Sequence, residues 1–182
     1  CITLVGCQNN NITNATIKGA GNKASSFAAG INLIRDCSQF NINNVIVSDI
    51  KAGTVSEDTF IHAVGIGVSS VNGEFSQHGY IGNSQISNIN GYKVGNKEPD
   101  GDGIYLIQRP SADCSGDSYI TVSNCTITDC AKRGIKVSTR YTNIDNCYID
   151  IDGWGAAIEA QYGKMTLRDS TIHLSLIHIS EP

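Results

Sequence analysis

Methionine, tryptophan and proline are scarce in this chain of 182 residues, which contains one, one and three of them, respectively. Basic residues are also few, because 13 Lys and Arg stand against 17 Asp and Glu and give a net charge of −4. This balance lacks the electropositive character that nucleic-acid binding requires, so no nucleic-acid partner is expected. No apolar run approaches the roughly 18 residues of a membrane-spanning helix, so no membrane insertion is expected.

Isoleucine, asparagine and glycine are abundant instead, with 25, 17 and 19 residues. β-Branched residues favour strands, whereas asparagine and glycine favour turns. A hydrophobic content of 40% over this length supports one folded domain and excludes disorder as the main state. The composition therefore predicts an all-β domain in which short strands alternate with turns.

The two ends of the sequence have unusual features. The chain opens at Cys1 without an initiator methionine or a signal-like apolar segment. Residues 174–182 (LSLIHISEP) resemble the translation of a transposon-derived sequencing adapter, the alternative being a natural apolar strand. We therefore expect residues 1–173 to form the fold, residues 174–182 to be a non-native tail, and the domain to be truncated at both ends.

Two short motifs recur along the chain. The first has an apolar residue, Asn or Asp two positions later, a mostly small side chain next, and an apolar residue two positions further. Its copies begin at Ile12, Ile42, Ile81, Val122, Ile144 and Leu167. The second, Gly or Ala followed by Ile, any residue and an apolar residue, begins at Gly30, Gly65, Gly103, Gly134 and Ala157. Such short strands enclose a core only when stacked, so we expect a parallel β-solenoid of about six coils.

The asparagine of the first motif recurs at the same turn of each coil. Asparagine tolerates the left-handed backbone of such a turn, and its amide can bond to the copies above and below as a ladder. We expect a buried ladder that includes Asn44, Asn83, Asn124 and Asn146. Alternation along each strand places the Ile residues inward and their neighbours outward.

Cysteine and histidine show no metal-ligand spacing, so no metal site is expected from them. Cys125 and Cys147 occupy the same position in successive coils and should stack as small buried thiols, with a disulfide as the alternative. His62, His78 and His173 are scattered, and we interpret each as a surface loop residue.

Together the motifs resemble the right-handed, single-stranded parallel β-helices of the pectate-lyase-like superfamily. The segments DGDGIYL (100–106) and NCTITDCAKRGIKV (124–137) are most similar to bacteriophage tailspikes and related polysaccharide depolymerases. Over residues 1–173, this resemblance implies a sugar-binding groove along the first sheet, an extracellular or virion-associated location and a homotrimer. The activity stays open, because this solenoid is shared by lyases, hydrolases, esterases and noncatalytic shafts.

The outward side chains of the first sheet are the candidates for chemistry. Tyr105, Lys136 and Glu159 each follow the Ile of the second motif, so they should form a file with gaps of about 4.8 Å. Glu159 is the only carboxylate of this file. It is a candidate general acid or base next to Lys136, and the alternative is an ordinary cross-strand ion pair.

Two further carboxylates, Asp100 and Asp102, lie just before their strand, and Lys132 and Arg133 lie one coil later. Asp102 is a candidate partner of Glu159 for hydrolysis, although their expected backbone separation of about 14 Å is long for such a pair. For elimination, Arg133 or Lys136 would be the base, and the two Asp residues could hold calcium. Otherwise no cofactor is expected, and the alternative for DGDG is a simple turn at the strand entry.

Aromatic and polar side chains near this face are the candidates for sugar binding. An aromatic ring packs against the apolar face of a pyranose, and Trp154 should be exposed between two glycines. The substrate-binding candidates are Tyr105, Trp154, Tyr162, Gln161 and Lys132. The sequence thus favours a β-helix that binds a polysaccharide or cell-surface glycan and cleaves it by hydrolysis or elimination. The alternative is a noncatalytic β-helical shaft or adhesin segment.

Overall fold

The computed structural model describes residues 1–22, 26–53, 62–70, 74–92, 95, 98, 100–108, 117–161 and 164–174. Within these ranges the chain forms strands and no helix. The strands belong to three sheets, A, B and C, and each strand pairs in parallel with its equivalents in the neighbouring coils.

Each turn of the chain contributes one strand to each sheet, in the order A, B, C. Sheet A contains β1 (Ile2–Val5), β4 (Phe27–Ile34), β7 (His62–Ser69), β10 (Gly101–Ile107), β13 (Arg133–Ser138) and β16 (Ile158–Ala160). Sheet B contains β2 (Asn11–Thr13), β5 (Asn41–Asn43), β8 (Tyr80–Gly82), β11 (Asp117–Ser123), β14 (Arg140–Asp145) and β17 (Met165–Arg168). Sheet C contains β3 (Thr16–Lys18), β6 (Ile46–Ala52), β9 (Gln85–Gly91), β12 (Thr126–Cys130), β15 (Tyr148–Ile151) and β18 (Thr171–Leu174).

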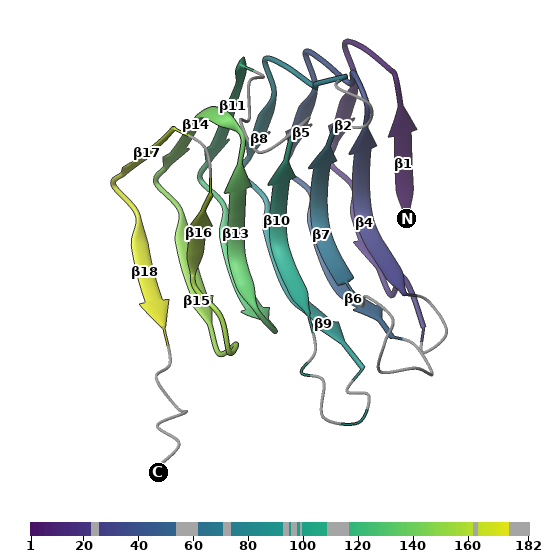
Figure 1. Ribbon diagram of the computed structural model, residues 1–182, viewed down its shortest axis with the longest axis vertical. Coiled ribbons are helices and arrows are strands. Elements are labelled where there is room, and N and C mark those ends of the chain that lie inside the picture. Colours follow the sequence, from purple (N-terminus) through teal and green to yellow (C-terminus); the bar gives the residue numbers. More distant parts are fainter. Residues whose placement is uncertain are drawn as a thin grey trace.

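This arrangement is a right-handed parallel β-helix of six coils, which confirms the predicted fold (Figure 1). The strands of sheet A lie side by side in chain order, so the axis of the solenoid runs from β1 to β16 (Figure 1). Strand β18 ends at Leu174, the first residue of the predicted tail. Residues 175–182 of that tail lie outside the described residues.

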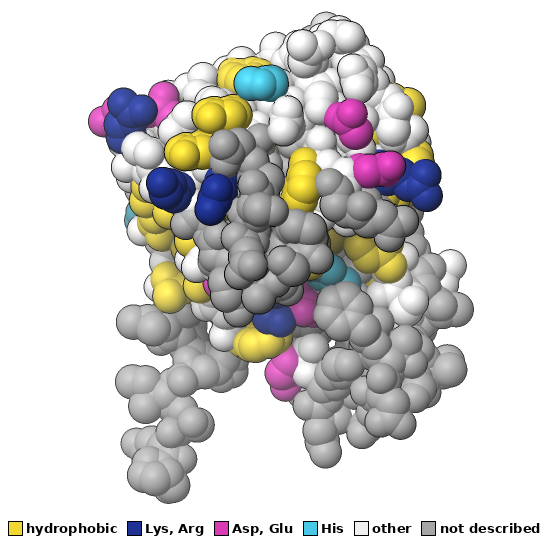
Figure 2. Space-filling model, turned by 45° about the horizontal axis from the view of Figure 1, so that its top comes forward, with side chains coloured by type: hydrophobic (Ala, Val, Ile, Leu, Met, Phe, Trp, Pro, Cys, Tyr) yellow, Lys and Arg dark blue, Asp and Glu magenta, His cyan; other side chains and the backbone are white. Residues whose placement is uncertain are grey.

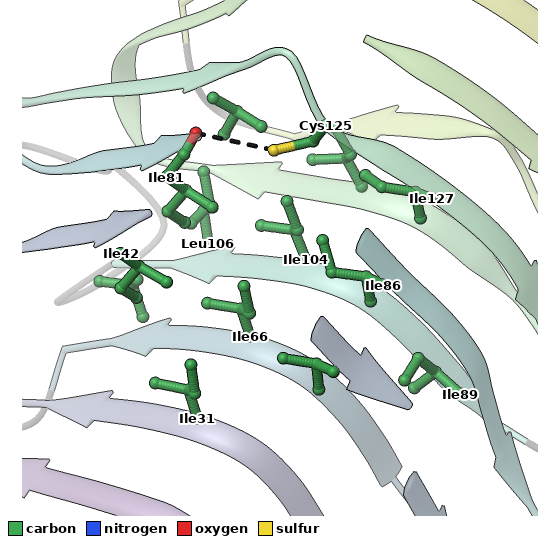
Figure 3. Close-up of a cluster of buried hydrophobic side chains, with 14 of the residues drawn as sticks. Ile31, Ile42, Ile66, Ile81, Ile86, Ile89, Ile104, Leu106, Cys125 and Ile127 are labelled. Atoms are coloured by element: carbon green, nitrogen blue, oxygen red, sulfur yellow. Dashed lines mark hydrogen bonds between the residues drawn. The ribbon is translucent and has the colours of Figure 1, made fainter. Parts of the chain in front are cut away.

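Isoleucine forms the inner wall of the solenoid, as the alternation predicts. Ile31, Ile66, Ile104 and Ile135 are partners in register on successive strands of sheet A, and all four are fully buried. Ile42, Ile81, Ile86 and Ile127 reach the same core from sheets B and C (Figure 3). Each coil therefore rests its aliphatic side chains on those of the next coil.

The glycine that precedes each of the four fully buried isoleucines of sheet A is required by close packing between coils. A Cβ on Gly65 would lie 2.4 Å from the carbonyl oxygen of Gly103 and 2.6 Å from Cγ2 of Ile86. The carbonyl is backbone on the neighbouring strand, so the clash is relieved only by moving β10 away from β7. Even the smallest side chain is therefore expected to disturb the spacing of the coils.

We expect Gly65→Ala to lower the free energy of unfolding by about 1–3 kcal/mol, the range for overpacked cores. The matched control is Gly67→Ala on the same strand, where the closest contact of a Cβ would be the Oδ1 atom of the Asn32 side chain at 3.0 Å. Urea unfolding of both variants measures the difference. Equal losses in the two variants would contradict the proposed backbone clash.

The asparagine turn between sheets B and C has the predicted left-handed backbone, with φ between 48° and 54° at Asn14, Asn44, Asn83, Asn124 and Asn146. The amide ladder is present. Asn44 Nδ2 donates to Asn14 Oδ1 at 2.7 Å, and Asn146 Nδ2 donates to Asn124 Oδ1 at 2.6 Å. Asn83 departs by one residue, because its Nδ2 donates to Asn43 at 2.8 Å.

The prediction that the ladder is buried was wrong, because all five of these asparagines are exposed. The residue that follows each of them points inward instead. Two of these inward residues are Cys125 and Cys147, which are buried free thiols as predicted. The Cys125 thiol donates to the carbonyl oxygen of Ile81 (Figure 3). Its hydrogen bond with the Cys147 thiol and its burial both raise the pKa of Cys125, so this thiol stays protonated.

Candidate functional site

The outer face of sheet A carries the predicted file of side chains. Tyr105, Lys136 and Glu159 are partners in register on β10, β13 and β16. The ammonium nitrogen of Lys136 lies 3.4 Å from Oε1 of Glu159 and 6.0 Å from the ring centre of Tyr105. The geometry of the file is therefore confirmed, whereas the roles given to these residues stay predictions.

A second file on the same face contains Asp102 and Arg133, which are also partners in register. Asp102 and Tyr105 are three residues apart, and regular alternation would place them on opposite faces of the sheet. Gly103 and Ile104 both face the core, however, so Asp102 and Tyr105 both face outward. Arg133 Nε donates to Asp102 Oδ1 at 2.8 Å, and Arg133 Nη1 donates to Glu159 Oε2 at 3.1 Å. One guanidinium thus connects the two carboxylates that the sequence suggested as a hydrolytic pair.

The remaining predicted charges join the same network. Lys132 Nζ donates to Asp100 Oδ2 at 2.7 Å, and Arg133 Nη2 lies 3.5 Å from Asp100 Oδ1. We call Asp100, Asp102, Lys132, Arg133, Lys136 and Glu159 the charged cluster. It contains all five predicted catalytic residues and one predicted substrate-binding residue.

The interpretation of His62 as a surface loop residue was wrong. His62 is 2% exposed and is the first residue of β7. Its Nε2 atom lies 2.8 Å from Asp102 Oδ2, and its ring packs edge-on against Tyr105 at 4.4 Å between centroids. The signal in the sequence was the apolar run HAVGIGV, which extends the strand four residues before Ile66 and brings His62 to the sheet.

Accessibility divides the charged cluster into two parts. The side chains of Asp102 and Arg133 are 0% and 4% exposed, whereas that of Glu159 is 28% exposed. A buried charge is tolerated only when it is paired, and Asp102 is paired on both oxygens, by Arg133 and by His62. Glu159 is therefore the carboxylate of the cluster that a ligand reaches most readily, and Asp102 holds the network in place.

The charge of Asp102 also affects the core side of the sheet. Burial and the nearby Asp102 and Asp129 carboxylates raise the pKa of the Cys130 thiol far above its ordinary value. A thiol in this state is protonated and unreactive, so Cys130 acts as a small apolar side chain.

His62, Asp100 and Asp102 bring their ligand atoms within 4.8 Å of one another, which raises the question of a cation site. Both oxygens of Asp102 already accept hydrogen bonds, and Asp100 is bonded to Lys132. Calcium needs six to eight oxygen ligands, and two cationic side chains beside these carboxylates oppose its binding. The arrangement suits ion pairing among side chains better than calcium binding.

Of the predicted sugar-binding residues, Tyr105 lies in the file on sheet A, and the other four lie as follows. Trp154 is 48% exposed, as predicted, and Lys132 Nζ lies 4.5 Å from its ring centre, so it borders the charged cluster. Gln161 lies just after β16, where its backbone N–H donates to Val137. Tyr162 lies outside the described residues.

A separate aromatic stack lies at the start of sheet B, with Tyr119 on β11, Tyr141 on β14 and His78 just before β8. His78 and Tyr119 are parallel with centroids 5.4 Å apart, and Tyr119 and Tyr141 are parallel at 4.9 Å. Because the rings cover one another's faces, they are poorly placed to pack on a sugar. We interpret this stack as a connection between coils, separate from the site on sheet A.

On the face that Figure 2 shows, acidic and basic side chains are interspersed rather than separated by sign. Among the described residues, no helix is long and apolar enough to cross a membrane. Comparison with protein-family models, with curated proteins and with solved structures found no match to this chain.

Proposed function

We propose that the outer face of sheet A binds a polysaccharide or cell-surface glycan and that the charged cluster cleaves its glycosidic bond. The observation that carries this proposal is the position of Glu159, a partly exposed carboxylate at the end of a buried chain of ion pairs. Buried charges stabilise a fold poorly, and their concentration on one face is typical of functional sites. The resemblance to polysaccharide depolymerases supplies the substrate class.

In this proposal Glu159 acts as general acid or base, and Arg133 and Lys136 orient its two oxygens. Asp102 is a positioning residue, because its carboxylate has no exposed surface and holds Arg133 and His62. Asp100, whose side chain is 13% exposed, is the better candidate for a second carboxylate. Trp154 and Tyr105 would contact the sugar rings beside the cluster.

The contacts favour hydrolysis over elimination. Elimination requires a basic side chain to accept a proton, and Arg133 is held by three carboxylates while Lys136 is paired with Glu159. A base must be free to reach the sugar, and both of these side chains are instead engaged by carboxylates. Hydrolysis needs only the carboxylates that the cluster already presents.

A noncatalytic shaft or adhesin segment is the second candidate. It is favoured by the fact that each of the three carboxylates of the cluster has a cationic partner within 3.5 Å. In either case the resemblance to tailspikes supports an extracellular or virion-associated location and a homotrimer as part of the proposal.

Incubation of the chain with a panel of capsular and pectic polysaccharides tests the proposal. New reducing ends without absorbance of unsaturated sugars are expected, because hydrolysis adds water across the bond. Unsaturated products would show that the reaction is elimination and not hydrolysis. Binding without any cleavage would favour the adhesin, and neither binding nor cleavage would favour the shaft.

A further inference from the structure

A pocket lies on the same face of sheet A as the charged cluster, toward the first coils. It has a volume of about 340 Å³, and its walls include Thr3, Phe27, Ala29, Asn32 and Ile34. Asn32 is two strands away from Tyr105 in register, which corresponds to about 10 Å along the solenoid axis. A ligand that runs across the strands can therefore occupy this pocket and reach the charged cluster.

The buried polar side chain among the described residues of this pocket is an amide without a partner, whereas Thr3 is exposed. Asn32 is 7% exposed, and its buried Oδ1 atom has no hydrogen-bond partner among the described residues. An unsatisfied buried amide is costly, so a ligand that bonds to it gains affinity. Because no hydrogen bond holds Oδ1, the side chain can turn about its last torsion and present the oxygen or the NH₂ group.

The rest of the pocket selects the kind of group that enters. The side chains of the described residues that line it are all uncharged, and the one charged group at its wall is the α-ammonium of Cys1, so an ammonium group finds no ion-pair partner there. Phe27 is 47% exposed and, with Ala29 and Ile34, forms an apolar wall beside the Asn32 amide. A fitting group has a hydrogen-bonding amide and a small apolar end side by side.

We propose that this pocket binds the acetamido group of an N-acetylated sugar, with its amide paired to Asn32 and its methyl on the wall formed by Phe27 and Ala29. This inference rests on the proposed function and names the substrate class of the same face: a glycan with N-acetylhexosamine units. A sugar that carries only hydroxyl groups satisfies Asn32 but leaves the apolar wall uncovered.

Saturation-transfer NMR on the full chain, with N-acetylglucosamine, N-acetylgalactosamine and glucose as probes, tests the pocket. We expect the strongest transfer at the acetyl methyl of one or both acetamido sugars and at least tenfold weaker binding of glucose. Asn32→Ala and Phe27→Ala should each weaken binding of the acetamido sugar at least tenfold. Phe27 is half-exposed, so its variant tests the pocket even if Asn32→Ala fails to fold.

The matched control is Asn143→Ala, which removes an exposed asparagine from sheet B and should leave binding unchanged. Equal binding of glucose and both acetamido sugars, or unchanged binding in Phe27→Ala, would overturn the inference. Its failure is distinguishable from failure of the proposed function. Cleavage of a polysaccharide without acetamido groups would overturn this inference alone, whereas acetamido binding without binding to any polysaccharide would overturn the proposed function alone.

Discussion

Arg133→Met is expected to lower the free energy of unfolding by about 3–5 kcal/mol, the cost of leaving a buried charge without its partner. The guanidinium is 4% exposed and donates to Asp102, which has no exposed surface. Methionine fills much of the same volume but offers no donor, so Asp102 would keep only His62. Denaturant unfolding followed by circular dichroism measures the effect.

The matched control for this substitution is Arg168→Met at an exposed position on β17, where we expect a change below about 0.5 kcal/mol. Adding Asp102→Asn to Arg133→Met should recover part of the lost stability, because the unpaired charge is removed as well. A loss below 1 kcal/mol in Arg133→Met, or no recovery in the double variant, would show that the network is not held together as described.

Glu159→Gln should reduce turnover of a cleaved glycan by at least 100-fold, the lower end of what a general acid or base contributes. Glutamine keeps the shape of the side chain but cannot exchange a proton. Binding of the glycan should change much less, because Trp154 and the pocket around Asn32 are untouched. Initial rates of reducing-end formation and an equilibrium binding measurement separate the two effects.

Asp150→Asn is the control for Glu159→Gln, since it removes a carboxylate from β15 of sheet C and should leave the rate unchanged. If the Glu159→Gln variant cleaves at the rate of the parent chain, Glu159 is not a catalytic residue. Asp100→Asn would then be the next variant to examine, because Asp100 is the other partly exposed carboxylate of the cluster.

The fold was predictable because each coil repeats the same local requirements. Ile-x-Asn marks a strand of sheet B and its left-handed turn, and Gly-Ile marks a buried position of sheet A. Both motifs reflect requirements within a few neighbouring residues, so a single sequence is enough to recognise them. The exposure of Asn124 and its equivalents was mispredicted, because the motif alone does not show whether the asparagine or the residue after it points inward.

The site was predictable only in part. The file of Tyr105, Lys136 and Glu159 follows from the period of the strands, and the structure places it as expected. The contacts of Arg133 with both Asp102 and Glu159 depend on two consecutive inward residues, Gly103 and Ile104, which break the simple alternation. The role of His62 was not predicted, because His62 and Asp102 are far apart in the sequence and meet only through the pairing of the neighbouring strands β7 and β10.

Hydrogen–deuterium exchange with a bound glycan tests most directly whether sheet A is the functional face. A glycan that binds the chain is expected to slow exchange in β4, β7, β10, β13 and β16 and in the segment around Trp154. Exchange in the strands of sheets B and C should stay unchanged. Protection confined to sheet B or C, for a glycan that binds the chain, would show that sheet A is not the functional face.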